Sequence, residues 1–96
     1  MLNSKQRAYL KSEAAKIDTI LQVGKAGVTP EVVKSASEAL AARELIKGCV
    51  LDNCFDDVRN IAETIAGRAR AEVVQTIGRR FVLYKPSDKQ RYTLPK

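Results

Sequence analysis

The residues whose types and spacing point most directly to chemistry are Gly24, Lys25, Ala26 and Gly27, which form one short segment. Glycine allows backbone torsions that other residues avoid, and it lacks a Cβ atom, so a sugar-phosphate chain can approach the peptide closely. Lys25 places a mobile positive charge between the two glycines. The segment therefore predicts a loop that binds phosphate, and all four residues are candidates for that site.

The residues that follow the loop predict the start of a helix. Thr29 is a good N-cap residue, and Pro30 suits the first helical position. A helix N-terminus presents unpaired amides and partial positive charge, which favour a phosphate group. KH domains hold nucleotide backbones with a G-x-x-G loop of this kind. We therefore add Thr29 to the site, mainly as a helix cap and secondarily through its hydroxyl.

The loop has three other possible interpretations. Glycine turns between a strand and a helix are common, so the segment could be a plain connection. A nucleoside triphosphate site of the G-x-x-x-x-G-K-[ST] type does not fit, because Lys25 lies between the glycines. The dinucleotide-binding pattern G-x-G-x-x-G is also missing.

The distribution of charge favours a polyanionic partner. The net charge is +6, and it is concentrated at the chain ends, with +3 over residues 1–16, −2 over 17–77 and +5 over 78–96. Such polarity suits a polyanion such as a nucleic acid, although excess lysine and arginine can also serve solubility alone. Four further cations are candidates for RNA contacts: Arg7 and Lys11, four residues apart on a predicted helix, and Arg79 and Arg80, at a predicted turn.

Catalysis and metal binding find little support in the sequence. The chain contains no histidine, which is the commonest metal ligand and general base. Cys49 and Cys54 have neither redox-pair nor zinc-site spacing, and we expect both to be free thiols that act as small hydrophobic residues. No paired carboxylates or activated nucleophile are evident. We therefore expect a non-enzymatic protein with no metal, no cofactor and no small-molecule substrate.

The elements that must position the loop form one α/β (α+β) domain over residues 1–96, with a basic tail at 87–96. Apolar periodicity predicts the order αβαβαββ, with helices near 4–16, 30–43 and 56–69 and strands near 18–23, 45–51, 72–77 and 80–85. We expect a four-stranded mixed sheet packed with three helices. No apolar run reaches the roughly 20 residues that span a bilayer, and no secretory signal is visible, so the expected location is cytoplasmic.

Ordered segments along the chain resemble the CRM domain (chloroplast RNA splicing and ribosome maturation) in its bacterial stand-alone YhbY-type form. The resemblance rests on the loop segment 24–29, the segments 43–47, 74–79 and 82–86, and the Leu-Pro ending of 91–96. It implies a fold similar to the C-terminal domain of translation initiation factor three. It also implies association with precursors of the large ribosomal subunit. Arg43 and Gly48 depart from the family, whose members often have histidine and usually valine there.

The leading hypothesis is a monomeric RNA-binding protein that assists large-subunit assembly by gripping precursor ribosomal RNA. The alternative is a protein-interaction module that docks on ribosomal proteins or an assembly GTPase. Under the first hypothesis, Lys25→Ala, Gly24→Asp and Gly27→Asp should weaken RNA binding while thermal stability stays nearly unchanged. The few aromatic residues favour recognition of the RNA backbone and shape over reading of bases.

Overall fold

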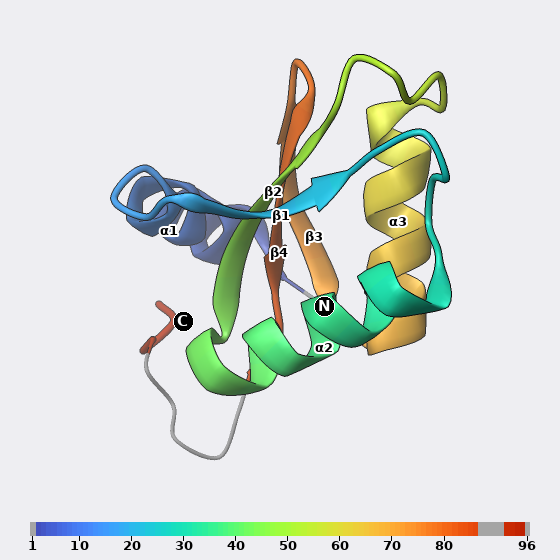
Figure 1. Ribbon diagram of the computed structural model, residues 1–96. Helices are drawn as coiled ribbons and strands as arrows, with labels where there is room; N and C mark the ends of the chain where they lie inside the picture. The colour runs from blue at the N-terminus through green and yellow to red at the C-terminus, as the bar shows by residue number, and fades with distance from the viewer. Residues whose placement is uncertain (1, 87–91, 96) are drawn as a thin grey trace.

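The computed structural model describes residues 2–86 and 92–95 and confirms the predicted element order (Figure 1). Its elements are α1 (Ser4–Ala14), β1 (Thr19–Val23), α2 (Pro30–Arg43), β2 (Leu45–Val50), α3 (Val58–Ala69), β3 (Glu72–Ile77) and β4 (Arg80–Tyr84). Residues 87–91 and 96 of the predicted basic tail lie outside the described residues. No helix in the described part of the chain is long and apolar enough to cross a membrane.

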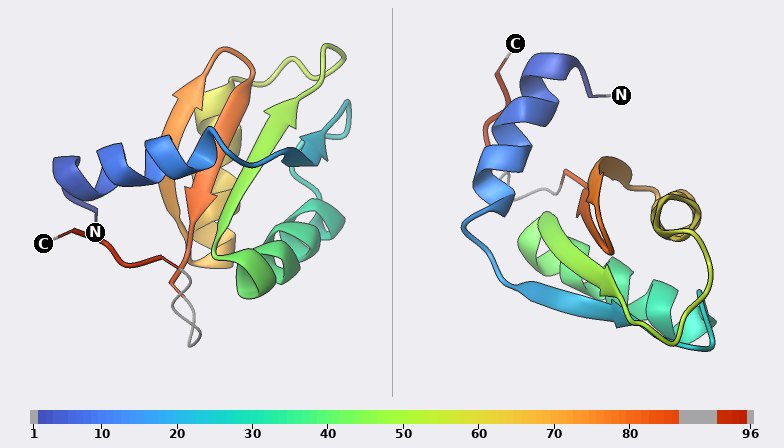
Figure 2. Two further views of the ribbon diagram at one scale, coloured as in Figure 1. Left: turned by 90° about the vertical axis from the view of Figure 1, so that its left-hand side faces the viewer. Right: turned by 90° about the horizontal axis from the view of Figure 1, so that it is seen from above.

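The four strands form the predicted mixed sheet, in the order β1-β2-β4-β3. Strands β1 and β2 are parallel, whereas β4 runs antiparallel to both of its neighbours. Helices α2 and α3 cover one face of the sheet, and α1 crosses the other face (Figure 2). Because β1 and β2 are parallel, their carboxyl ends lie at the same end of the sheet as the β3–β4 hairpin turn (Figure 1).

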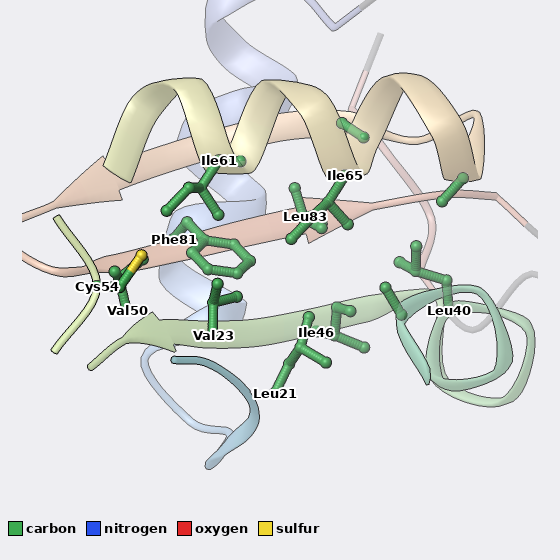
Figure 3. Close-up of a cluster of buried hydrophobic side chains, with 14 residues drawn as sticks. Leu21, Val23, Leu40, Ile46, Val50, Cys54, Ile61, Ile65, Phe81 and Leu83 are labelled. Carbon is green, nitrogen blue, oxygen red and sulfur yellow. The ribbon is translucent and has the colours of Figure 1, made fainter. Parts of the chain in front are cut away.

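Each face of the sheet has its own hydrophobic core. The larger core lies between the sheet and helices α2 and α3, with Leu40, Ile65 and Leu83 all fully buried (Figure 3). The smaller core packs α1 against β2, β3 and β4, with Leu10 at its centre and Tyr92 and Leu94 against its side. The described part of the C-terminal segment therefore contacts the domain, and α1 is held by apolar packing as well as by its capping box at Asn3.

Gly48 faces the ring of Phe81, its partner across the β2–β4 ladder. A Cβ atom at this position would lie 2.4 Å from Phe81 Cζ and 2.6 Å from Phe81 Cε2, closer than real atoms approach. The glycine therefore leaves space that the aromatic ring fills. Figure 3 shows the Phe81 ring extending from β4 into the larger core. The glycine that departs from the family at position 48 thus gives room for a close neighbour across the sheet.

Both cysteines are free thiols, as the sequence predicted. Cys54 is 2% exposed and belongs to the larger core, so it acts as a small hydrophobic residue. Cys49 lies on β2 and is half-buried.

Tyr84 is buried at the end of β4. Burial raises the pKa of its phenol, and the negative charge of the wholly buried Glu44 and the nearby Tyr9 raise it further. A group whose pKa is raised on folding contributes stability that is present below its unfolded pKa and is lost as the pH rises through the folded pKa.

We therefore expect the free energy of unfolding to fall as the pH rises above about 10, the ordinary pKa of tyrosine, partly through Tyr84. Tyr84→Phe should reduce this alkaline loss, because it removes the proton that Tyr84 must give up. Urea denaturation of both proteins between neutral pH and pH ~11 measures the difference in slope. Equal alkaline slopes for Tyr84→Phe and the wild type would contradict the assignment.

Candidate functional site

The segment from Gly24 to Gly27 forms a tight turn between β1 and α2. The Gly27 amide donates a hydrogen bond to the Gly24 carbonyl at 2.9 Å, which closes the turn. Gly27 is buried with a φ of +71°, a conformation that favours glycine. Lys25 and Ala26 occupy the tip and are exposed. The turn thus presents Lys25 and Ala26 to solvent, with the half-buried backbone of Gly24 beside them.

The φ of Gly27 corrects one expectation. A residue with a side chain would be strained at this positive φ, and its Cβ atom would also lie 3.2 Å from Asp56 Oδ2. Gly27→Asp would therefore destabilise the fold, and the prediction that thermal stability stays nearly unchanged is wrong at this position. Gly24 is different, because a Cβ atom there would meet Leu51 Cδ1 at 3.6 Å and Asn53 Oδ1 at 3.7 Å, which are ordinary contacts.

Thr29 caps α2 as predicted, and the cap limits how the helix can bind an anion. The Val32 amide donates to Thr29 Oγ1 at 3.2 Å, and the Val33 amide donates to the Thr29 carbonyl at 3.1 Å. Pro30 has no N–H group. The first helical turn therefore leaves at most the Glu31 amide for an outside anion. The main positive charge of the site comes from Lys25, and the helix end is a minor contributor.

The loop between β2 and α3, residues 51–57, lies directly against the glycine turn. The Leu51 amide donates to the Val23 carbonyl at 2.8 Å, which ties the two strand ends together. The contacts that a Cβ atom would make at Gly24 and Gly27 come from Leu51, Asn53 and Asp56, all in this loop. The two loops thus lie side by side at this end of the sheet (Figure 1).

Arg79, at the turn between β3 and β4, holds the loop of residues 51–57 through hydrogen bonds. Its guanidinium donates to the carbonyls of Val50 at 3.0 Å, Leu51 and Cys54 at 3.0 Å. Its own carbonyl accepts from the Val50 amide at 2.7 Å. A further ion pair to Asp52 at 3.6 Å involves a fully exposed carboxylate and contributes little. The structure therefore gives Arg79 a positioning role for residues 50–54.

Arg79→Ala is expected to lower the free energy of unfolding by about 1–2 kcal/mol, because three carbonyls lose a charged donor. Relative to the wild type, amide hydrogen exchange in Arg79→Ala should accelerate more at residues 51–55 than in the strands. Arg80→Ala is the matched control, since Arg80 is exposed one residue further on and its loss should change neither quantity. Unchanged exchange in Arg79→Ala would show that the loop holds its shape without the guanidinium.

The remaining predicted cations lie on the α1 side of the sheet. Arg7 donates to the carbonyls of Val73 and Val74 on β3. Lys11 and Arg80 line a hollow of about 320 Å³ between α1 and the sheet. Lys47 lines the same hollow, and its Nζ donates to the Ile17 carbonyl at 3.2 Å. The structure therefore brings Lys11 and Arg80 together but separates both of them, and Arg7, from Lys25.

One residue of the surface beside the glycine turn was missed by the sequence reasoning. Phe55, in the loop between β2 and α3, is 94% exposed. Its position in a polar run, outside any apolar periodicity of strand or helix, was the available signal.

Comparison with known proteins gives consistent matches over nearly the whole chain. The family model described as the CRS1 / YhbY (CRM) domain matches residues 2–85. A Bacillus subtilis (strain 168) relative named "Probable RNA-binding protein YqeI" is 46% identical over 91 residues, covering 95% of each chain. A Haemophilus influenzae relative named "RNA-binding protein" is 34% identical over 95 residues, covering 99% of this chain and 96% of the relative.

A solved structure agrees with the fold. The solution structure of the hypothetical protein SAV1595 from Staphylococcus aureus, titled "a putative RNA binding protein", superposes with a TM-score of 0.84 at 43% sequence identity. The match covers 99% of this chain and 100% of that one. These relatives are named for RNA binding, and the names contain no enzymatic activity.

Proposed function

The chain belongs to the CRS1/YhbY (CRM) domain family, and from this premise we propose that it is a cytoplasmic, non-enzymatic RNA-binding protein that grips the RNA backbone at the turn from Gly24 to Gly27. The observation that carries the proposal is the turn itself. The turn exposes Lys25 at its tip and has the half-buried Gly24, without a side chain, next to it. A hydrogen bond from the Leu51 amide to the Val23 carbonyl ties the neighbouring loop to the strand that leads into the turn. The names of the relatives support RNA as the ligand.

The geometry favours contact with the backbone of the RNA through one charged point. Lys25 supplies the full charge, and the absence of a side chain at Gly24 lets a phosphate come close to the peptide. The capped helix behind the turn adds a smaller attraction. Arg79 acts through the loop that it braces. The hollow that Lys11, Lys47 and Arg80 line on the α1 side offers a second electropositive surface for a folded RNA.

We propose precursor ribosomal RNA of the large subunit as the target, which the CRM resemblance of the sequence implies. A structured RNA could contact both Lys25, at the end of the sheet, and the basic side chains on the α1 face. The protein acts as a monomer in this proposal, and the RNA bridges the two surfaces.

Crosslinking in cells, followed by sequencing of the bound RNA, tests the proposal. We expect enrichment of large-subunit ribosomal precursors, with the crosslinks lost in Lys25→Ala. Recovery of scattered messenger RNA without ribosomal precursors would overturn the ribosomal target and leave RNA binding intact. Association with ribosomal particles that survives nuclease treatment, with little dependence on salt, would instead favour docking on a ribosomal protein or an assembly GTPase.

A further inference from the structure

Phe55 is unlike every other aromatic residue of the protein. The chain has two phenylalanines, three tyrosines and no tryptophan. Phe81 and Tyr84 are buried, and Tyr9 and Tyr92 pack against the smaller core. Phe55 alone among the five is exposed, at 94% of its surface. Burying a phenyl ring is favourable relative to leaving it in water, so the exposed ring is available to a partner outside the chain.

The ring is attached to the same surface as the glycine turn. Phe55 lies between Asn53, whose Oδ1 faces the space above Gly24, and Asp56, whose Oδ2 faces Gly27. Both of its near neighbours along the chain therefore contact the turn. A nucleotide whose phosphate lies at Lys25 would have its base within reach of this loop.

The loop that bears Phe55 is held in place. Cys54, the preceding residue, is 2% exposed and anchored in the larger core. Its amide donates to the Leu51 carbonyl at 3.0 Å, and its carbonyl accepts from Arg79 at 3.0 Å. A ring on a fixed backbone loses less conformational freedom on binding than a ring on a loose loop.

We propose that Phe55 stacks on an unpaired base of the RNA whose backbone is held at the glycine turn. This inference rests on the proposed function and adds a base contact to it. A single ring surrounded by Asn53 and Asp56 offers far less apolar area than the ~800 Å² that each partner of a typical protein interface buries, but it is enough for one base. The carboxylates of Asp56 and Asp57, which follow Phe55 in the chain, repel a phosphate beside the ring, so they favour a base rather than the backbone at this position.

Stacking predicts that the loss of the ring weakens RNA binding while the fold is unaffected. With an RNA hairpin that carries an unpaired loop, Phe55→Ala should raise Kd about fivefold or more, as for single stacked bases elsewhere. Phe55→Leu keeps apolar bulk without an aromatic face and should weaken binding nearly as much, whereas Phe55→Tyr should bind like the wild type. Ile20→Ala, at another exposed apolar residue, on β1 and outside the hollow that Lys11 and Arg80 line, is the control and should change nothing.

A direct readout uses Phe55→Trp, which creates the sole tryptophan of the chain. Its fluorescence should be quenched by the hairpin but not by the same strand annealed to its complement, in which every base is paired. If Phe55→Ala and Phe55→Leu bind the hairpin like the wild type and Phe55→Trp shows no quenching, stacking is wrong, and weak binding by Lys25→Ala would still uphold the proposed function. If the wild type binds neither the hairpin nor the fully paired RNA, both the stacking of Phe55 and the proposed function are wrong. Phe55→Ala could instead bind RNA normally and lose affinity for nuclease-treated ribosomal particles. That result would contradict base stacking and show that Phe55 contacts a protein.

Discussion

Gly24→Asp is expected to weaken binding to structured RNA at least tenfold while the protein stays folded. In the proposed function the phosphate backbone approaches Gly24, so the new carboxylate would lie beside a phosphate, and two like charges about 5 Å apart near a protein surface repel by roughly 1–3 kcal/mol. The substitution is tolerated by the fold, because Gly24 has no positive φ and its added Cβ atom would make only ordinary contacts at 3.6 and 3.7 Å. Fluorescence anisotropy with a labelled ribosomal RNA fragment measures Kd, and thermal unfolding checks stability.

Two controls separate the local charge from other effects. Gly24→Ala adds the Cβ atom without the charge and should change Kd by less than the aspartate does. Gly67→Asp makes the same change in net charge on α3, at an exposed position where a Cβ atom meets nothing within 4 Å. It should leave Kd within about twofold of the wild type. Equal weakening by Gly67→Asp and Gly24→Asp would indicate that only the overall charge matters.

Gly48→Val is expected to destabilise the domain by about 3 kcal/mol or more, enough to unfold much of it. The Cβ atom alone would lie 2.4 Å from Phe81 Cζ, and Phe81 is 1% exposed in the larger core, so the ring has little room to move. Overpacking of a core typically costs about 1–3 kcal/mol and occasionally more, and this contact is shorter than a side-chain adjustment relieves. Urea denaturation monitored by circular dichroism measures the loss.

A second substitution tests the cause. Phe81→Leu removes the three ring atoms nearest to the added Cβ, so the double variant Gly48→Val/Phe81→Leu should recover much of the stability that Gly48→Val loses. Gly67→Ala is the matched glycine control, and it should stabilise α3 by about 0.5–1 kcal/mol. Additive losses in the double variant would contradict a clash between residues 48 and 81.

The element order, the mixed sheet and the place of the glycine turn could all be predicted from the sequence, because their signals are local. Alternating and helical apolar patterns determine the strands and helices, and Thr29 followed by Pro30 determines where α2 begins. The same local reasoning placed Lys25 at the tip of the turn and Cys54 among buried residues, and the structure agrees on both.

What the sequence could not show depends on residues far apart in the chain. The insertion of β4 between β2 and β3, and with it the contact of Gly48 and Phe81, follows from strand pairing that no local pattern specifies. Arg79 was predicted as an RNA contact, yet its partners are carbonyls 25 to 29 residues away. Lys11 and Lys25 share a charge sign but lie at different surfaces of the fold. The exposure of Phe55 likewise became visible only in three dimensions.

The dependence of RNA affinity on salt, measured for the wild type and for Lys25→Ala, tests the central claim most directly. Each phosphate contact that a lysine makes releases counterions, so the plot of log K against log salt should become less steep by about one unit when Lys25 is removed, and affinity should fall at every salt concentration. Lys5→Ala, at an exposed position on α1, should keep the wild-type slope. An unchanged Kd and an unchanged slope in Lys25→Ala would show that the turn from Gly24 to Gly27 does not hold the RNA.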